Sequence, residues 1–361
     1  MKTMHKSQCA QEIIIGLTVF LVTFMNVYLS RYQRLTSEIS VQAERAILYL
    51  PESGQISDLI TDLYEQGIHF DKNELLWAAN LLNWKSYRAG RYEINGSYSY
   101  NRFLSKLGRG EQDPFLVRVQ AGQNHDSFTL RTSLQFRFSQ EELDAAMKDS
   151  SMLRQHNIEE HHLLGRMLPN SYEMYWTATP QQFLARMLRE FDTAVTRPYG
   201  ERAAELGISI DEAVILASII EWEVRHVDEK RKVSGLYWNR LNRRMRLQAD
   251  PTVAHAIGER RRLLFADYRV DHPYNTYRIF GLPPGPINNP RLTSITAALY
   301  PEQHNYIYMV ASGDGSGYHV FTTNYADHRR ESRRWTNWLR EQRRIRDLEA
   351  QQEQTTGTNS R

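Results

Sequence analysis

The chain has 361 residues, with 45 Lys and Arg against 42 Asp and Glu, 41% hydrophobic residues and one cysteine. At about 100–200 residues per domain, this length predicts two or three domains. A mixed-sign charged fraction of 24% excludes a disordered chain, and 19 Gly with 12 Pro exclude a fibrous protein. A single cysteine excludes an internal disulfide, and the nearly balanced charge gives no reason to expect nucleic acid as a partner.

The first apolar segment is a run of uncharged residues from Ile13 to Leu29. About 17–25 such residues are enough to span a bilayer as a helix, so we expect a transmembrane anchor at 13–29. Residues 1–12 would then be a cytoplasmic N-terminus and residues 30–40 a polar connector. Lysines precede the run and arginines follow it, so charge favours this orientation only weakly. The lack of a small-residue cleavage site just after the run favours a retained anchor over a cleaved signal peptide.

Residues 41–149 have the pattern of a small β/α module. Ser57–Gly67 begins with a serine cap, has helical apolar spacing and ends at a glycine. The Asn95-Gly96 pair, between apolar residues on either side, predicts a hairpin turn. Six aromatic residues of this module suit either its core, which we favour, or stacking on sugar rings: Trp77, Trp84, Tyr87, Tyr92, Tyr98 and Tyr100.

The strongest chemical signal is an almost wholly apolar helix predicted at residues 211–224 (DEAVILASIIEWEV), with a capping box at Ser209. It contains two acids, Glu221 and Glu223, which lie about 160° apart around the helix and cannot form a carboxylate pair. A carboxyl among apolar neighbours loses hydration, which favours the protonated form that a general acid needs. Glu221 is therefore the candidate acid, and an ordinary ion pair with Arg225 on a solvated face is the alternative.

Polar turns rich in proline and glycine follow this helix, at residues 247–252 (LQADPT), 274–277 (YNTY) and 281–287 (GLPPGPI). Such rigid loops are good carriers of site residues. Neutral hydrogen-bonding groups and aromatic faces beside an acid suit an uncharged polysaccharide. The sequence has no phosphate-binding loop, no nucleophile elbow at 313–317 and no Cys/His cluster with zinc spacing, so we expect no cofactor and no metal.

Four segments carry a family resemblance: LASIIEWEV (216–224), LYWNRLNRRMRLQADPTV (236–253), YNTYRIFGLPPGPINNP (274–290) and YIYMVASGDGSGYHVF (306–321). In order and spacing they resemble the YceG-like (MltG) family of endolytic murein transglycosylases. The likeness is dense from about Leu163 to His328 and weaker before it.

The implied fold is α+β. It has an N-terminal transmembrane helix, a small LysM-like β/α module at 41–149, a larger mixed α/β catalytic domain at 150–348 and a disordered tail at 349–361.

The resemblance also implies a function. The enzyme would be anchored once in the cell inner membrane, with its catalytic domain on the periplasmic side. It would cut the MurNAc-GlcNAc β-1,4 bond of nascent peptidoglycan strands, leave 1,6-anhydro-MurNAc ends and terminate glycan elongation beside peptidoglycan synthases (penicillin-binding proteins). The family's catalytic glutamate would be the first acid after the apolar helix, Glu221. The implied substrate-binding residues are Asn239, Gln248, Asp250, Tyr274, Asn275, Thr276, Tyr277 and His319.

The chain departs from the family pattern at three places. Residues 164–172 (LGRMLPNSY) lack the usual glutamate and tyrosine of this loop, which makes a role in catalysis doubtful there. Trp222 stands where a lysine is common, as a packing or sugar-facing ring. Arg291 replaces the glycine of an Asn-Pro-Gly turn.

The chemistry needs only one protein carboxyl. Ordinary glycosidases use two, whereas in a lytic transglycosylase the substrate's own 6-hydroxyl is the nucleophile. A muramidase-type hydrolase with Asp250 as second carboxylate is one alternative, and a non-catalytic wall-binding scaffold is another. The arginine clusters at 243–246 and 260–262 are expected on solvated faces, with peptide-stem carboxylates of peptidoglycan as the one partner chemistry that they suggest.

Overall fold

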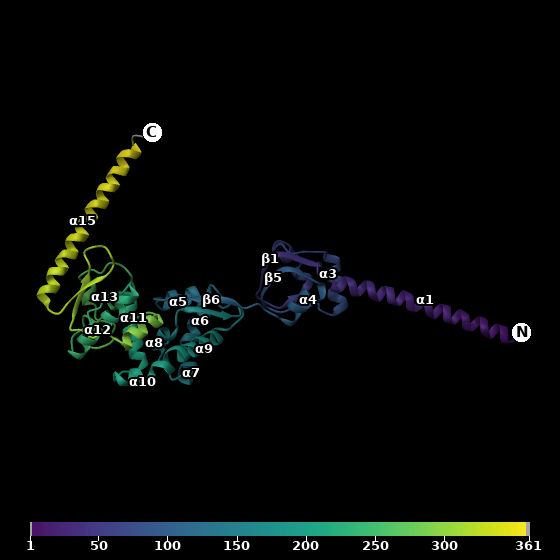
Figure 1. Ribbon diagram of the computed structural model, residues 1–361, viewed down its shortest axis with the longest axis horizontal. Helices are drawn as coiled ribbons and strands as arrows, with labels where there is room; N and C mark the ends of the chain where they lie inside the picture. Colours follow the sequence, from purple (N-terminus) through teal and green to yellow (C-terminus); the bar gives the residue numbers. More distant parts are fainter. Residues whose placement is uncertain (1, 359–361) are drawn as a thin grey trace. The chain divides into compact units, whose positions relative to one another are not determined.

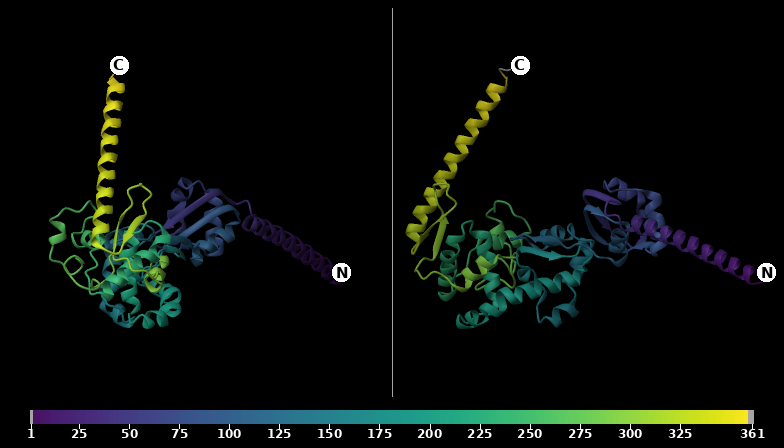
Figure 2. Two further views of the ribbon diagram at one scale, coloured as in Figure 1. Left: turned by 60° about the vertical axis from the view of Figure 1, so that its left-hand side comes forward. Right: turned by 45° about the vertical axis from the view of Figure 1, so that its right-hand side comes forward.

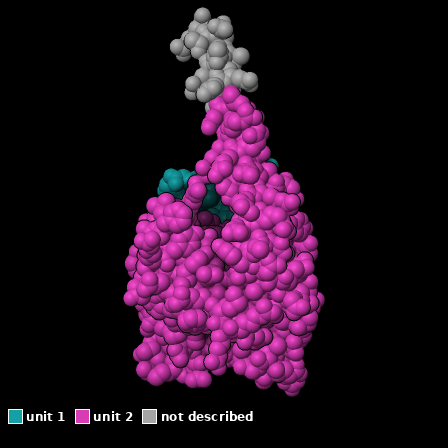
Figure 3. Space-filling view, turned by 90° about the vertical axis from the view of Figure 1, so that its left-hand side faces the viewer, with its two compact units in different colours: residues 1–116, 173–178 teal, residues 117–172, 179–361 magenta. Residues whose placement is uncertain are grey.

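The computed structural model describes residues 2–358, with the side chains of residues 11–349. The chain forms two compact units, drawn as ribbons in Figure 1 and as surfaces in Figure 3: residues 1–116 with 173–178, and residues 117–172 with 179–361. The first unit thus ends before the expected boundary at residue 149.

The reason for the earlier boundary is an aromatic cluster in the second unit. Phe128, Phe136 and Phe138 gather around Phe183, with ring centroids 5.5–6.3 Å from its ring. All four rings are buried. This cluster joins the segment before residue 149 to the core of the second unit.

Helix α1 (Lys2–Thr36) contains the expected anchor segment. Its part Gln11–Thr36 is long and apolar enough to cross a membrane, and no other helix among the described residues passes the same test. The helix continues into the expected polar connector as far as Thr36. Near its end, Arg34 donates two hydrogen bonds to Glu74 and lies 4.0 Å over the ring of Trp77.

The first unit is built on an antiparallel strand pair. β1 (Val41–Leu50) pairs with β5 (Gly90–Tyr98), and the short β3 (His69–Phe70) lies on the other edge of β1. Apolar residues of these strands and of the helices share one buried core. The remaining elements are η1 (Ile56–Leu59), α2 (Ile60–Glu65), α3 (Lys72–Leu82), α4 (Tyr100–Arg109) and the paired strands β2 (Gly54–Gln55) and β4 (Ser86–Tyr87).

The Asn95-Gly96 pair does not form the predicted hairpin but lies inside β5. The register shifts from Ala43↔Gly96 to Ala46↔Ile94, so two residues of β1 face Asn95 alone. This is a β-bulge, and the φ of +80° at Gly96 is a conformation that glycine adopts without strain. The bulge also explains why the buried positions of β1 skip from Ala43 to Ala46.

The aromatic residues of the first unit serve its core. Tyr92, Tyr98 and Tyr100 are buried, and Trp77, Trp84 and Tyr87 are partly buried and pack against the same cluster. This is the outcome that the sequence favoured over sugar stacking. The LysM-like character of the unit stays a prediction.

Residues Glu173–Ala178 return to the first unit from within the sequence of the second. Trp176 packs edge-on against Tyr49, with ring centroids 5.2 Å apart, and Thr177 donates a 2.9 Å hydrogen bond to Gln112. The chain therefore passes between the units at residues 116, 172 and 178.

Helix α11 (Ile210–Glu223) is central to the second unit. All residues from Ala213 to Glu221 are buried, which accounts for a sequence without a polar face. It packs against α14 (Leu292–Leu299), α12 (Lys230–Asn242) and α13 (Asp250–Ala256). The other helices of the unit are α5 (His125–Ser133), α6 (Gln140–Met147), α7 (Ser150–Gln155), α8 (Glu160–Leu163), η2 (Leu164–Arg166), α9 (Pro180–Phe191), η3 (Asp192–Thr196), α10 (Arg197–Glu205), η4 (Val227–Glu229) and η5 (Asp267–Arg269).

Besides β6 (Phe115–Val119) and β7 (Asn170–Met174), which pair with each other, the chain has a late two-stranded ribbon. β8 (Tyr308–Ala311) runs antiparallel to β9 (His319–Thr322), and α15 (Tyr325–Thr358) begins beside them, as Figure 2 shows. The tail expected to be disordered at 349–361 is helical through residue 358, and residues 359–361 lie outside the described residues.

Candidate active site

Two acids mark the end of α11, and the structure places them in opposite surroundings. Successive residues of a helix turn by about 100°, so Glu221 and Glu223 leave the helix on different sides. Glu221 is directed at α12 and α14, whereas Glu223 lines a cavity of about 970 Å³.

The Glu221 carboxylate is enclosed, with only 3% of its side chain exposed. It accepts hydrogen bonds from Lys230 Nζ at 2.9 Å and from Ser294 Oγ at 2.6 Å, and it also contacts the guanidinium of Arg291. The backbone N–H of Arg291, just before α14, donates at 3.3 Å. Lys230 is 2% exposed and also donates to Ser294 Oγ at 2.7 Å. The carboxylate therefore caps the start of α14 and ties three helices together.

The assignment of Glu221 as the acid stays a prediction, and the geometry around this side chain argues against it. A general acid must reach the atom that it protonates, directly or through one water. Glu221 does not line the cavity, and its oxygens are occupied by a buried ammonium, a hydroxyl and an arginine. The expected alternative, a pair with Arg225 on a solvated face, is also not formed, because Glu221 pairs with the buried Lys230 and Ser294 and with the exposed Arg291. Its place in the structure is that of a helix-joining ion pair.

Glu223 has the features that the sequence led us to expect of Glu221. It is the last residue of α11 and partly buried, and its Oε1 accepts a 3.0 Å hydrogen bond from the hydroxyl of Tyr237 on α12. Burial, helped by the negative charge of Asp250, raises the pKa of Glu223 to about 7. The carboxyl is therefore about half protonated at neutral pH, as an acid that also acts as a base requires.

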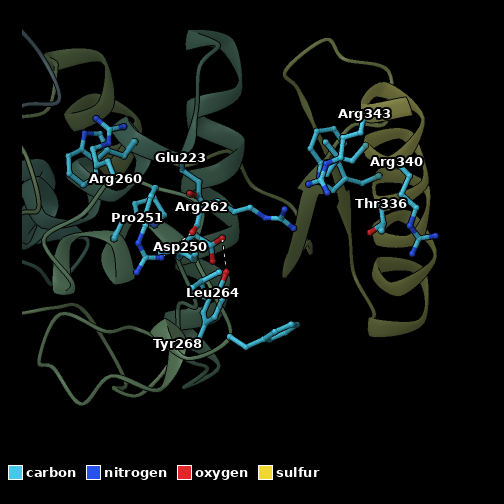
Figure 4. Close-up of a pocket in the computed structure, with 17 residues that line it drawn as sticks. Glu223, Asp250, Pro251, Arg260, Arg262, Leu264, Tyr268, Thr336, Arg340 and Arg343 are labelled. Atoms are coloured by element: carbon cyan, nitrogen blue, oxygen red, sulfur yellow. Dashed lines mark hydrogen bonds between the residues drawn. The ribbon is translucent and has the colours of Figure 1, made fainter. Parts of the chain in front are cut away.

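Asp250 is the second carboxylate of the cavity and belongs to the first turn of α13. Its Oδ1 accepts a 2.6 Å hydrogen bond from the hydroxyl of Tyr277, and its Oδ2 accepts one of 3.2 Å from Tyr268. Burial and the charge of Asp250 raise the pKa of both tyrosines, that of Tyr268 to about 12, so both remain donors at neutral pH. Figure 4 shows Glu223 and Asp250 on one side of the cavity, with α15 on the other.

Two expected sugar donors instead hold the loops that carry these groups. Thr276 is fully buried and its Oγ1 accepts from the backbone N–H of Ala249 at 3.0 Å, next to Asp250. Asn275 is also fully buried and donates to the carbonyls of Val270 at 2.8 Å and Tyr268 at 3.2 Å. Their hydrogen-bonding capacity is used inside the protein, where they position Asp250 and its tyrosine partners, and their contact with sugar stays a prediction.

Three other expected groove residues lie elsewhere than on this cavity. Asn239 donates to the carbonyls of His304 at 2.7 Å and Tyr306 at 3.0 Å. Tyr274 contacts the ring of His255 and lines a separate cavity of about 390 Å³. Gln248, at φ +51°, is exposed and does not line either cavity. None of the three is among the residues that line the cavity with Glu223 and Asp250.

His319 does not line the cavity, but its charge interacts with that of Glu223. Its Nδ1 is 2.8 Å from Glu229 Oε2, and its backbone N–H donates to the other oxygen of Glu229 at 2.8 Å. Burial lowers the pKa of His319, but the hydrogen bond to Glu229 and the charges of Glu229 and Glu223 outweigh it, so the net shift is upward. The positive charge of His319 in turn favours the ionised form of Glu223.

Sequence reasoning missed two partners of the carboxylates and did not single out Glu223. Tyr237 and Tyr268 carry no local signal, because their role depends on contacts with residues 14 and 18 positions away. Trp222 lines the cavity, but its indole N–H donates to the carbonyl of Gly122 at 2.8 Å and Arg260 covers its ring at 4.2 Å.

Comparisons with known proteins agree with the resemblance seen in the sequence. The YceG-like family model matches residues 48–334. An endolytic murein transglycosylase of Bacillus subtilis is 24% identical over 302 residues, which are 79% of this chain and 83% of that protein. One of Streptococcus pneumoniae is 24% identical over 316 residues, 78% of this chain and 56% of its own length.

A solved structure supports the same assignment. The crystal structure of a YceG-like protein of Listeria monocytogenes shares 26% identity at a TM-score of 0.56, over 80% of this chain and 98% of that one. The family match extends over most of the chain, from the first strand to the start of the last helix. The chain therefore belongs to the YceG-like family.

Proposed function

We propose that this protein is an endolytic murein transglycosylase with Glu223 as its general acid and base. The observation that carries the proposal is a partly buried carboxyl, with its pKa raised to about 7, on the wall of a cavity that also holds Asp250. The curated relatives from Bacillus and Streptococcus bear the name of this activity. The proposal moves the acid two residues along the helix from its expected position.

The reaction needs one proton to be given and one to be taken. Protonated Glu223 donates to the glycosidic oxygen between C1 of N-acetylmuramic acid and O4 of N-acetylglucosamine, and the C1–O bond breaks. The resulting carboxylate takes the proton of the C6 hydroxyl, whose oxygen attacks C1 and closes the 1,6-anhydro ring. Glu223 ends protonated again, and no water is consumed.

Asp250 has an electrostatic role in this scheme. The negative charge of Asp250, held by Tyr277 and Tyr268, stabilises the positive charge that develops at C1 as the bond breaks. The same charge helps to keep Glu223 protonated in the free enzyme.

A hydrolase is the second candidate, because both carboxylates lie on one cavity. In that case Asp250 would activate water or attack C1, and the product would carry a reducing end in place of an anhydro ring. The two products differ in mass by one water molecule. Mass spectrometry of the fragments therefore separates them.

The test uses the full chain in detergent and uncrosslinked peptidoglycan strands. The expected result is fragments with 1,6-anhydro ends from the unchanged protein and none from E223Q. The matched control E201Q changes an exposed glutamate of α10 and should cleave normally. Reducing ends alone would refute the transglycosylase. Full cleavage by E223Q would show that another residue is the acid, and binding of strands without cleavage by the unchanged protein would favour a wall-binding scaffold.

The cellular setting is part of the proposal. We infer a single-pass inner-membrane protein with the catalytic unit on the periplasmic side, acting beside peptidoglycan synthases to end glycan elongation. The apolar segment of α1 supports the anchor. Reporter fusions to the two ends of the chain test the orientation, since an active periplasmic reporter is expected only at the C-terminal end.

A further inference from the structure

The cavity that holds Glu223 also carries positive charge, because arginines line it from two directions. One group is Arg260, Arg261 and Arg262, in the segment that follows α13. The other is Arg340 and Arg343 on α15. Figure 4 shows the α15 arginines on the side opposite Glu223 and Asp250.

Three of these arginines already have partners. Arg261 pairs with Asp267 at 2.7 Å and with Glu259. Arg260 lies over the ring of Trp222 at 4.2 Å. Arg340 donates a 3.3 Å hydrogen bond to Asn337 on its own helix. Of these three, only Arg261 has an acidic partner, whereas Arg260 and Arg340 are held by a ring and by a neutral amide.

Arg262 and Arg343 differ from the other three. Both are exposed and come from opposite walls, and within residues 11–349 neither side chain forms an ion pair, a hydrogen bond or a ring contact. The acids on the cavity wall are Glu223, about half protonated at neutral pH, and Asp250, which is held by two tyrosines. The cavity therefore has a cationic surplus that an uncharged glycan does not use.

The arginine side chains and the apolar residues beside them indicate what kind of ligand fits the cavity. A guanidinium offers a planar fork of N–H donors that matches a carboxylate, and cations on the walls of a cavity concentrate anions in it. Apolar side chains line the same walls, including Phe265, Trp335 and Leu339. A ligand that combines sugar-ring faces with attached carboxylates fits this surface better than a bare sugar chain or a simple anion.

We propose that Arg262 and Arg343 form an anionic subsite that binds the free carboxylates of peptide stems attached to the glycan strand, so that the enzyme prefers peptide-bearing over naked strands. This inference rests on the proposed function for the identity of the glycan. An anionic membrane surface is the rival source of negative charge, and it is disfavoured because the arginines line the same cavity as the carboxylate pair.

Binding is measured on the full chain in detergent, in the E223Q background so that no turnover occurs. The probes are uncrosslinked strands with peptide stems, strands stripped of stems, and strands whose stem carboxylates are converted to amides. We expect the intact stems to improve affinity about 10-fold over either of the other probes, as for two charge-assisted contacts. Adding R262Q and R343Q should reduce this ratio to about 1–2.

The matched control is R329Q with R333Q, which removes two exposed arginines of α15 that do not line the cavity. This control should keep the preference. The proposal is overturned if the ratio survives in the R262Q and R343Q protein, if amidated stems bind as well as free ones, or if the arginines matter only in vesicles containing anionic phosphatidylglycerol.

Turnover separates this inference from the proposed function. If the unchanged protein yields no anhydro ends but still prefers strands with free stem carboxylates, the reaction is wrong and the subsite stands. In an active enzyme, R262Q with R343Q should raise KM for peptide-bearing strands while kcat is largely kept. A fall in kcat with KM unaltered would contradict a binding role.

Discussion

Glu221 and Glu223 lie two residues apart at the end of α11, but they differ in burial, in hydrogen-bond partners and in access to a cavity. Glu221 is sealed among α11, α12 and α14 with a buried lysine, a serine and an arginine as partners. Glu223 has one hydroxyl donor and an open cavity beside it. Burial alone does not make a catalytic acid, because a carboxylate whose oxygens are paired inside the protein and that lines no cavity has no access to a substrate. Partial burial with few partners produces the raised pKa and leaves the group accessible.

The largest expected effect, and the sharpest test of the comparison, is loss of activity in E223Q. Removing a general acid lowers kcat by about 100- to 10,000-fold. The amide fits the same space and can still accept from Tyr237, so the melting temperature should not fall. Release of anhydro-ended fragments and a thermal melt on the same sample check both statements. A fully active E223Q would break the comparison.

The stability of E221Q tests whether Glu221 serves as a structural ion-pair partner. Lys230 is 2% exposed and would be left as an uncompensated buried charge, so we expect a loss of about 3 kcal/mol in the free energy of unfolding. E221Q with K230M removes both charges and should recover most of this loss. Denaturant unfolding of the three proteins measures it. If E221Q is as stable as the parent yet inactive, the acid is Glu221 after all.

The pH dependence of both acids sharpens the comparison further. Glu223 must be protonated, so kcat should fall about tenfold for each pH unit above pH 7. The raised pKa also means that the folded state binds one more proton than the unfolded state between about pH 4.5 and 7. Stability from this group is therefore full below pH 4.5 and is lost as pH rises to about 7, where E223Q should be more stable than its parent by on the order of 1–3 kcal/mol.

The smallest expected effect is that of Y237F. The hydroxyl of Tyr237 stabilises the ionised form of Glu223, so its removal should raise the pKa of Glu223 further. The alkaline limb of the pH–rate profile should then move upward by roughly half a unit, with only a few-fold change in kcat at its plateau. A limb that moves downward, or does not move, would show that this hydrogen bond does not tune the acid.

Local patterns in the sequence predicted much of the fold around the site. The capping box at Ser209 and the apolar run placed α11 within one residue of its observed ends, and the box is formed as expected. The anchor segment lies within α1. These features depend on neighbours close in sequence, so a single chain is enough to reveal them.

Local sequence patterns could not decide which of the two acids, Glu221 or Glu223, lines a cavity. Both look alike in the sequence, and what separates them is a set of distant partners: Ser294 is 73 residues from Glu221, and Tyr237 is 14 from Glu223. The same limit applies to Asn275 and Thr276. Their side chains could hydrogen-bond to a sugar, but they form hydrogen bonds with backbone groups that only the fold brings near. The Asn95-Gly96 pair failed for a related reason, since glycine at positive φ occurs both in hairpin turns and, as here, inside a strand opposite a bulge.

The stretch Glu173–Ala178 affects how the protein can be divided for experiments. A fragment ending at residue 116 would lack Trp176 and Thr177, so Tyr49 and Gln112 would lose their partners and the fragment would present surface that is covered in the intact chain. A fragment starting at residue 117 would carry the same stretch without the residues that hold it. Cutting the gene once between the two units therefore damages both products, and grafting residues 173–178 onto the shorter piece through a linker is the way to obtain it intact.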